Sequence, residues 1–144
     1  MCIRDRNILV VEDDEIELLK FKMVTGTLGL VHQFEYATDG ERAIDYLRDK
    51  NKALPQLILL DLNMPRFDGF EFLSMMRTDV DLRYIPTVIM TSSENEKDIK
   101  KCYELGIAGY LTKPLELEEY ETKLRALFNY WELNMLYKAK GSTE

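Results

Sequence analysis

Five short apolar runs recur along the chain and predict five β-strands. The run Leu57 to Leu60 has no polar alternation, which is typical of a strand covered on both faces and favours the centre of a parallel sheet. The run His32 to Ala37 alternates polar and apolar residues, so we expect a strand nearer the sheet edge, with His32 at the surface. The other three expected strands are Asn7 to Val11, Thr87 to Met90 and Ala108 to Leu111.

Helical periodicity fills the segments between and after these runs. The apolar positions that repeat at helical spacing are Ile16, Leu19 and Met23; Ala43, Ile44 and Leu47; Phe70, Phe72, Leu73 and Met76; Ile99, Cys102 and Tyr103; and Leu117, Tyr120, Leu124, Leu127 and Trp131. Strands that alternate with helices through short loops predict an α/β domain with a parallel sheet.

Composition narrows the class of protein. A chain of 144 residues suits one domain, and a net charge of −7 argues against a nucleic-acid partner, since phosphate contacts need clustered cations. Cys2 and Cys102 lie far apart without metal-ligand spacing, which favours reduced thiols in a cytosolic protein. No apolar run approaches the roughly 20 residues of a membrane span, so we expect a cytoplasmic protein without a membrane segment.

Asp61 directly follows the most apolar strand. The carboxyl ends of parallel strands form the ligand crevice of open α/β sheets, so a carboxylate there is a candidate site residue. Taken alone, Asp61 could equally be a capping or turn residue.

Three other strand ends also carry polar side chains. Glu12 and Asp13 follow the first strand, Thr91 ends the fourth, and Lys113 follows the fifth. Carboxylates around a crevice suit Mg²⁺, which prefers oxygen ligands and pairs with phosphate. A hydroxyl and a lysine can then hold phosphoryl oxygens, which makes this set of side chains suitable for phosphoryl transfer.

The motifs ILVVEDD, LILLDLNMPRFDG, VIMTSS and GYLTKP together resemble the receiver domain of two-component response regulators. Thr91 follows Asp61 by 30 residues and Lys113 follows it by 52, as in the chemotaxis-type single-domain regulators. The resemblance covers residues 7–128 and implies a flavodoxin-like (βα)5 doubly wound sheet with strand order 2-1-3-4-5. Residues 1–6 fit no structural period and are assigned no function.

The resemblance implies that Asp61 is a phosphoacceptor, which takes the phosphoryl group from a sensor histidine kinase. It also implies a Mg²⁺ site made by Glu12, Asp13, Asp61 and the backbone carbonyl of Asn63. Asp13 would bind the ion directly and Glu12 through water. Such a protein is not an enzyme but assists its own phosphorylation and dephosphorylation.

The resemblance further implies that Thr91, Ser92 and Lys113 contact the phosphoryl group. Thr91 and Tyr110 would form the switch pair, in which the hydroxyl moves onto the phosphoryl group and the aromatic ring turns inward. The bond between Lys113 and Pro114 is expected to be cis, a state that only X–Pro bonds reach cheaply.

A narrower resemblance comes from YELG, DLRYIP and the aromatic segment FNYWELNMLY. These are similar to single-domain regulators of bacterial and cyanobacterial phytochrome kinases, which implies a phytochrome-type kinase as partner.

Residues 129–144 would form a helical extension and tail. Tyr130, Leu133 and Tyr137 make a second apolar stripe there, which predicts a homodimer through the fourth helix, fifth strand and last helix. The alternative is that the extension folds back on its own domain.

Two other functions remain as alternatives. A phosphatase of the haloacid-dehalogenase type would also use Asp61 as nucleophile with Mg²⁺, but it needs a general acid where this chain has Asn63. A flavodoxin-like electron carrier shares the fold class, but it needs a phosphate-binding loop after the first strand, where this chain has EDDE.

Overall fold

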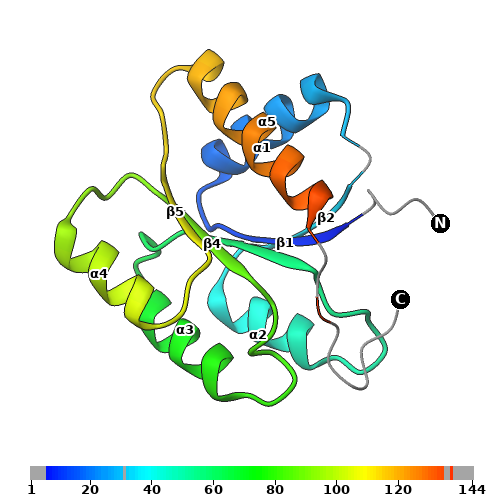
Figure 1. Ribbon diagram of the computed structural model, residues 1–144, viewed down its shortest axis with the longest axis vertical. Helices are drawn as coiled ribbons and strands as arrows, with labels where there is room; N and C mark the ends of the chain where they lie inside the picture. The colour runs from blue at the N-terminus through cyan, green and yellow to red at the C-terminus, as the bar shows by residue number, and fades with distance from the viewer. Residues whose placement is uncertain (1–5, 31, 135–136, 138–144) are drawn as a thin grey trace.

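The computed structural model describes residues 6–30, 32–134 and 137 (Figure 1). The strands form a parallel sheet in the order β2-β1-β3-β4-β5, which confirms the expected fold and strand order. Their bounds are β1 Asn7–Val11, β2 Gln33–Ala37, β3 Leu57–Leu60, β4 Thr87–Thr91 and β5 Gly109–Thr112. These ranges differ from the predicted ones by one residue at most at either end.

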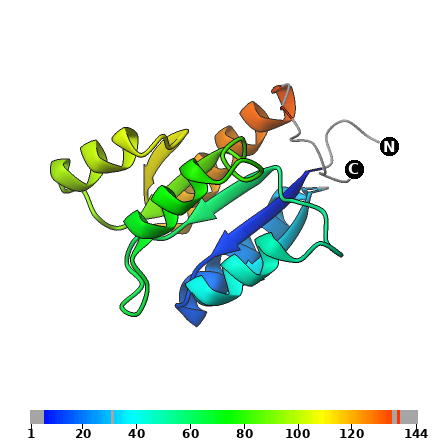
Figure 2. The same ribbon diagram turned by 90° about the horizontal axis from the view of Figure 1, so that it is seen from below.

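Helices cover both faces of the sheet (Figure 1). Their bounds are α1 Glu15–Leu28, α2 Gly40–Arg48, α3 Gly69–Thr78, α4 Glu96–Glu104 and α5 Leu117–Leu133. Helices α2, α3 and α4 pack on one face, and α1 and α5 pack on the other; Figure 2 shows the layers from a second direction. Within the described residues, no helix is long and apolar enough to cross a membrane.

The inner strands are buried on both faces. In β1, Leu9 and Val11 join the core beneath α2, α3 and α4, while Ile8 and Val10 join the core beneath α1 and α5. All four residues of β3 are buried, as its unbroken apolar run predicted. Helices packed on both faces hold the strands in place. The loops that carry the polar residues start at the ends of these strands, so the positions of the loops are set by the same packing.

Three aspartates cap helices that begin at the carboxyl edge of the sheet. Asp14 accepts hydrogen bonds from the backbone N–H groups of Ile16 and Glu17, and Asp39 and Asp68 cap α2 and α3 in the same way. A side-chain oxygen at this position satisfies an N–H group that the helix leaves unpaired. Asp14 therefore serves α1, and its neighbours Glu12 and Asp13 are available for another role.

Helix α1 does not bury the side that the sequence analysis predicted from the helical spacing of its apolar residues. Ile16, Leu19 and Met23 are 68%, 60% and 55% exposed, whereas the buried residues include Leu18 and Phe21. The helix has apolar residues on two sides, and packing selects the side that carries the large aromatic ring, because that ring buries the most apolar area. Phe21 lies edge-on to Phe34 of β2.

The expectation that His32 lies at the surface is wrong. His32 is 7% exposed, its ring centroid lies 5.6 Å from that of Phe128, and its Nε2 lies 3.4 Å from a carboxylate oxygen of Glu132. Helix α5 continues through Leu133 and covers the start of β2, which the alternation within β2 could not show. By contrast, Tyr103 and Leu117 are exposed, although spacing grouped them with inward-facing residues.

Gly40, the first residue of α2, lies against the ring of Phe67 from the loop after β3. A Cβ at Gly40 would come within 1.7 Å of Phe67 Cδ1, so any larger residue must displace the ring. Phe67 in turn packs edge-on against the buried Phe72 of α3. The loop that follows Asp61 is thus held against α2 by a contact that only glycine permits.

We predict that Gly40→Ala lowers the free energy of unfolding by about 1–3 kcal/mol, because overpacking displaces the Phe67 ring. Gly26→Ala is the matched control, since a Cβ at Gly26 of α1 meets no atom within 4 Å. That variant should gain about 0.5–1 kcal/mol from lower backbone entropy in the unfolded chain. Urea unfolding followed by circular dichroism measures both, and equal effects of the two substitutions would contradict the contact.

Candidate functional site

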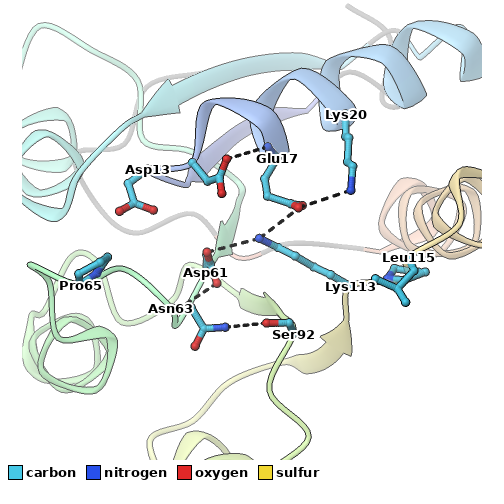
Figure 3. A pocket seen from close by; sticks show the side chains of 11 residues that line it. Asp13, Glu17, Lys20, Asp61, Asn63, Pro65, Ser92, Lys113 and Leu115 are labelled. Atoms are coloured by element: carbon cyan, nitrogen blue, oxygen red, sulfur yellow. Dashed lines mark hydrogen bonds and ion pairs between the residues drawn. The ribbon is translucent and has the colours of Figure 1, made fainter.

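A cavity of about 400 Å³ opens at the carboxyl edge of the sheet (Figure 3). Its walls come from the loops that follow β1, β3, β4 and β5, so side chains far apart in the sequence meet there. The lining residues are Asp13, Asp14, Glu17, Lys20, Asp61, Asn63, Pro65, Ser92, Lys113, Pro114 and Leu115. The structure therefore brings the four predicted strand ends to one place.

Carboxylate oxygens of Glu12, Asp13 and Asp61 lie within 4.8 Å of one another, and we call these residues the acidic cluster. Glu12 and Asp61 are only 5% and 6% exposed, whereas Asp13 is open to solvent. Adjacent carboxylates repel one another, more strongly when burial lowers the local dielectric. Oxygen ligands at this spacing suit a hard divalent cation such as Mg²⁺, so the residues present fit the expected metal.

Lys113 is the cation that reaches into the acidic cluster. Its Nζ forms an ion pair with Glu12. The same atom lies 3.3 Å from Asp61 Oδ2 and 3.8 Å from Glu17 Oε2 (Figure 3). Burial by itself would lower the pKa of Lys113, but the hydrogen bond and charge of Glu12, followed by the other two carboxylates, raise that pKa overall. Lys113 therefore keeps its positive charge beside Asp61.

The Glu12 carboxyl is held below the cavity rather than in its wall. It accepts a hydrogen bond of 3.3 Å from the backbone N–H of Asp14 and pairs with Lys113. Burial, followed by the neighbouring Asp61, raises the pKa of Glu12 to about 7, against the lowering effect of Lys113. Burial and the nearby Asp61 thus favour the protonated form of Glu12, while the ion pair with Lys113 favours the charged form.

Glu17 is a site residue that the sequence analysis missed. It lies in the first turn of α1, and its carboxylate bridges Lys113 at 3.8 Å and Lys20 at 3.6 Å. The available signal was its place in the first turn of α1, directly after the acidic end of β1.

Asn63 connects the phosphoacceptor candidate to the hydroxyls at the end of β4. Its backbone N–H donates to Asp61 Oδ1 at 3.0 Å. Its side-chain amide donates to Thr91 Oγ1 at 2.8 Å and to Ser92 Oγ at 3.0 Å. Thr91 has no exposed surface, so its hydroxyl lies behind the cavity wall. The sequence analysis considered only the backbone carbonyl of Asn63 and missed the role of its amide.

Tyr110 lies on β5 next to the same loop. Its hydroxyl donates to the backbone carbonyl of Ser93 at 2.9 Å, and Ser93 Oγ donates to Asp98 of α4 at 3.0 Å. Burial raises the pKa of the Tyr110 hydroxyl, which therefore stays protonated and acts as a donor near neutral pH. Hydrogen bonds thus join Thr91, Tyr110 and the start of α4 through the Ser92–Ser93 loop.

The expectation of a cis bond between Lys113 and Pro114 is wrong. No peptide bond among the described residues is cis, so this bond is trans. The trans isomer is the intrinsic preference of X–Pro bonds by about 0.5–1 kcal/mol. In this isomer the Lys113 side chain already reaches Glu12 and Asp61.

Comparison with protein families gives a match to the response regulator receiver domain over residues 8–125. Two curated relatives extend this similarity. The probable methanogenesis regulatory protein FilR2 of Methanothrix harundinacea is 35% identical over 127 residues, covering 86% of this chain and 82% of FilR2. The response regulator Rcp1 of Synechocystis sp. is 35% identical over 128 residues, covering 86% of this chain and 87% of Rcp1.

Solved structures show the same similarity. The crystal structure of the Mn²⁺-bound form of Rcp1 aligns with a TM-score of 0.83 and 34% identity, covering 92% of this chain and 99% of that chain. The crystal structure of the phosphorylated cyanobacterial phytochrome response regulator RcpA aligns with a TM-score of 0.84 and 31% identity, covering 92% of this chain and 98% of that chain.

Proposed function

The chain belongs to the response regulator receiver domain family, and we propose that its Asp61 accepts a phosphoryl group from a sensor histidine kinase. The observation that carries this proposal is the acidic cluster, in which Asp61 lies beside Lys113 at the floor of an open cavity. An open cavity lets the phosphohistidine of a partner approach Asp61. Because Asp61 is buried, a partner that covers the cavity excludes most of the water that would compete with Asp61 as the nucleophile.

In the proposed transfer, an oxygen of the Asp61 carboxylate attacks the phosphorus atom of the phosphohistidine. The new O–P bond forms as the P–N bond breaks, and the imidazole nitrogen keeps the electron pair and takes up a proton. Lys113 neutralises part of the charge on the phosphoryl oxygens, while the Asn63 N–H orients the second oxygen of Asp61. The protein thereby acts as a phosphoacceptor that assists its own phosphorylation and dephosphorylation, without being an enzyme.

A divalent cation, Mg²⁺, completes this site. Glu12, Asp13, Asp61 and the backbone carbonyl of Asn63 would hold it, and the ion supplies charge neutralisation for the phosphoryl oxygens. The close approach of the carboxylates in the acidic cluster supports the proposal. The Mn²⁺-bound form of Rcp1, a relative with 34% identity, supports it independently.

Thr91 and Tyr110 are the proposed switch residues, with Ser92 as a further contact for the phosphoryl group. The Thr91 hydroxyl is bonded to the Asn63 amide, so it must leave that partner to reach a phosphoryl group on Asp61. Because Ser93 lies between Thr91 and the Tyr110 hydroxyl, movement of this loop changes the contact of the tyrosine. The signal would then reach α4 and β5.

The phosphatase alternative is disfavoured by Asn63. A haloacid-dehalogenase-type enzyme needs an acid at this position to protonate its leaving group. The Asn63 amide cannot supply that proton, and its N–H groups are directed at Thr91 and Ser92.

We further propose a phytochrome-type kinase as the partner and the cytoplasm as the place where they meet. The support is the similarity to RcpA, whose crystal structure is described as that of a cyanobacterial phytochrome response regulator. The net charge of −7 favours a protein over nucleic acid as partner.

We propose a homodimer built on α4, β5 and α5. Tyr130 and Leu133 of α5 are 60% and 83% exposed, Tyr103 of α4 is 53% exposed, and β5 is an edge strand. Exposed aromatic and aliphatic side chains of this kind mark interfaces. Tyr137 is also exposed, and its ring centroid lies 4.5 Å from that of Tyr84 in the same chain. Met135 and Leu136 lie outside the described residues.

We keep residues 7–128 as the proposed receiver domain and residues 129–144 as its extension. Helix α5 continues past this division to Leu133, and Trp131 is buried in the core beneath α1 and α5. Tests of the dimer should therefore change exposed residues rather than remove the extension.

We predict that Asp61→Asn abolishes labelling by a small-molecule phosphodonor, because the amide cannot attack phosphorus. Wild-type protein should be labelled with Mg²⁺ and lose labelling in EDTA, since the acidic cluster repels an uncompensated phosphate. Asp45→Asn, an exposed change on α2, is the matched control and should label like wild type. Acid-labile phosphate is measured by mass spectrometry, and label that persists on Asp61→Asn would refute the assigned acceptor.

We predict that Thr91→Ala keeps Mg²⁺ binding but loses the structural response to beryllofluoride, which mimics the phosphoryl group. Thr91→Ser is the matched control, because it retains the hydroxyl and should retain the response. Backbone chemical shifts of α4 and β5 measure the response. Identical shift changes in Thr91→Ala and wild type would show that the switch is assigned to the wrong residue.

We predict that Leu133→Glu shifts the protein from dimer to monomer at tens of micromolar, because a charge at an apolar interface is desolvated without a partner. Val80→Glu, which changes another exposed apolar residue on the loop after α3, should leave the dimer intact. Sedimentation velocity, with and without beryllofluoride, measures the assembly. A wild-type protein that sediments as a monomer under both conditions would exclude the proposed dimer.

A further inference from the structure

A second cavity, of about 330 Å³, lies at the amino edge of the sheet, away from Asp61. It is formed by α3, the loop between α3 and β4, and the end of α4, which lie side by side in Figure 1. The lining residues include Leu73, Leu82, Ile85, Leu105, Arg77 and Arg83. No role proposed above uses this place.

The inner wall of this cavity is apolar. Leu73 and Met76 of α3 and Leu82 of the following loop belong to the buried core, and Ile85 and Leu105 pack against that core. A wall of this kind binds an apolar group by removing its surface from water.

The outer rim carries two arginines and no carboxylate among the lining residues. Arg77 Nη1 donates to the backbone carbonyl of Glu104 at 3.0 Å, and Arg83 Nη2 donates to the Tyr84 hydroxyl at 3.1 Å. Within the described part of the chain, neither guanidinium forms an ion pair. Each has five N–H donors, so most of them are available to a ligand.

The acidic residues nearest to the two arginines in the sequence are Asp79 and Asp81, and neither of them lines the cavity. The Asp79 carboxylate accepts hydrogen bonds from the backbone N–H groups of Asp81 and Leu82, at 2.9 and 3.1 Å. Two cations over an apolar wall, neither of them in an ion pair among the described residues, are unexpected in a chain whose net charge is −7. The cavity thus differs in charge from the rest of the protein.

We propose that this cavity binds a small organic anion with an aromatic or other compact apolar body. The carboxylate of the ligand would meet the guanidinium groups of Arg77 and Arg83, which suit planar carboxylates. Its apolar body would lie on the wall formed by Leu73 and Leu82. A volume of about 330 Å³ falls at the lower end of the range for small-molecule sites, which fits a ligand of one or two fused rings.

The probe for this proposal is 2-naphthoate, with the neutral 2-naphthamide as its uncharged match. Titration of the full chain, followed by methyl chemical shifts, should give saturable changes confined to Leu73, Leu82, Ile85 and Leu105. The amide should bind at least about fivefold more weakly, because it lacks the charge-assisted bonds. Equal affinity for the two probes, or changes scattered over the surface, would overturn the proposal.

Arg83→Gln should weaken 2-naphthoate binding at least about fivefold while leaving 2-naphthamide binding unchanged. Arg66→Gln is the matched control, since Arg66 is exposed at the other end of the sheet. Asp61→Asn should bind the probe like wild type, so the result is independent of the proposed phosphorylation. Methyl changes with a glutamate-rich peptide but none with 2-naphthoate would reject a small-molecule site in favour of a protein partner.

Discussion

Crowding of negative charge at the carboxyl edge of the sheet is the constraint on which the site depends. The acidic cluster places its oxygens within 4.8 Å of one another, and two of its members are almost fully buried. Such a cluster is costly unless its charges are paired and hydrogen-bonded. Lys113 pairs with Glu12 and Asp61, and backbone N–H groups of Asp14 and Asn63 bind the same two carboxylates. These contacts offset part of the repulsion, and the remainder favours a cation, which is the property that phosphoryl transfer needs.

The apolar strands determine where these charges meet. The last paired residues of β1 and β3 are followed directly by Glu12 and Asp61, so parallel pairing places the two carboxylates side by side. The last pair of β4 and β5 includes Thr91 and is followed by Lys113. Because the strands are buried on both faces, a shift of one residue would turn core side chains to the opposite helix layer. Packing of the core therefore fixes the relative positions of the polar residues that follow the strands.

The sequence alone predicted the order of the elements and the edge of the sheet where the site lies. It failed for features that are decided by tertiary packing. The positions of the strands follow from the apolar runs, and the placement of Asp61 at the carboxyl edge follows from the geometry of parallel sheets. The buried side of α1 does not, because the helix has apolar residues on two sides and only contact with β2 selects Phe21 over Leu19. The burial of His32 depends on the length of α5, and the role of Glu17 depends on the reach of a lysine from a distant strand. Each of these misses involves a partner remote in sequence.

Strand β4 and helix α4 connect the site to the cavity at the amino edge. Thr91 at one end of β4 is bonded to Asn63, while Thr87 at its other end lines the second cavity. Helix α4 also contacts both places, because Asp98 at its start accepts a hydrogen bond from Ser93 and the residues at its end line the cavity. Two ligands that prefer the same position of α4 strengthen each other's binding by equal factors, because the linkage is reciprocal. An anion in the cavity would then change the affinity for a phosphoryl mimic at Asp61 by the same factor that the mimic changes the affinity for the anion.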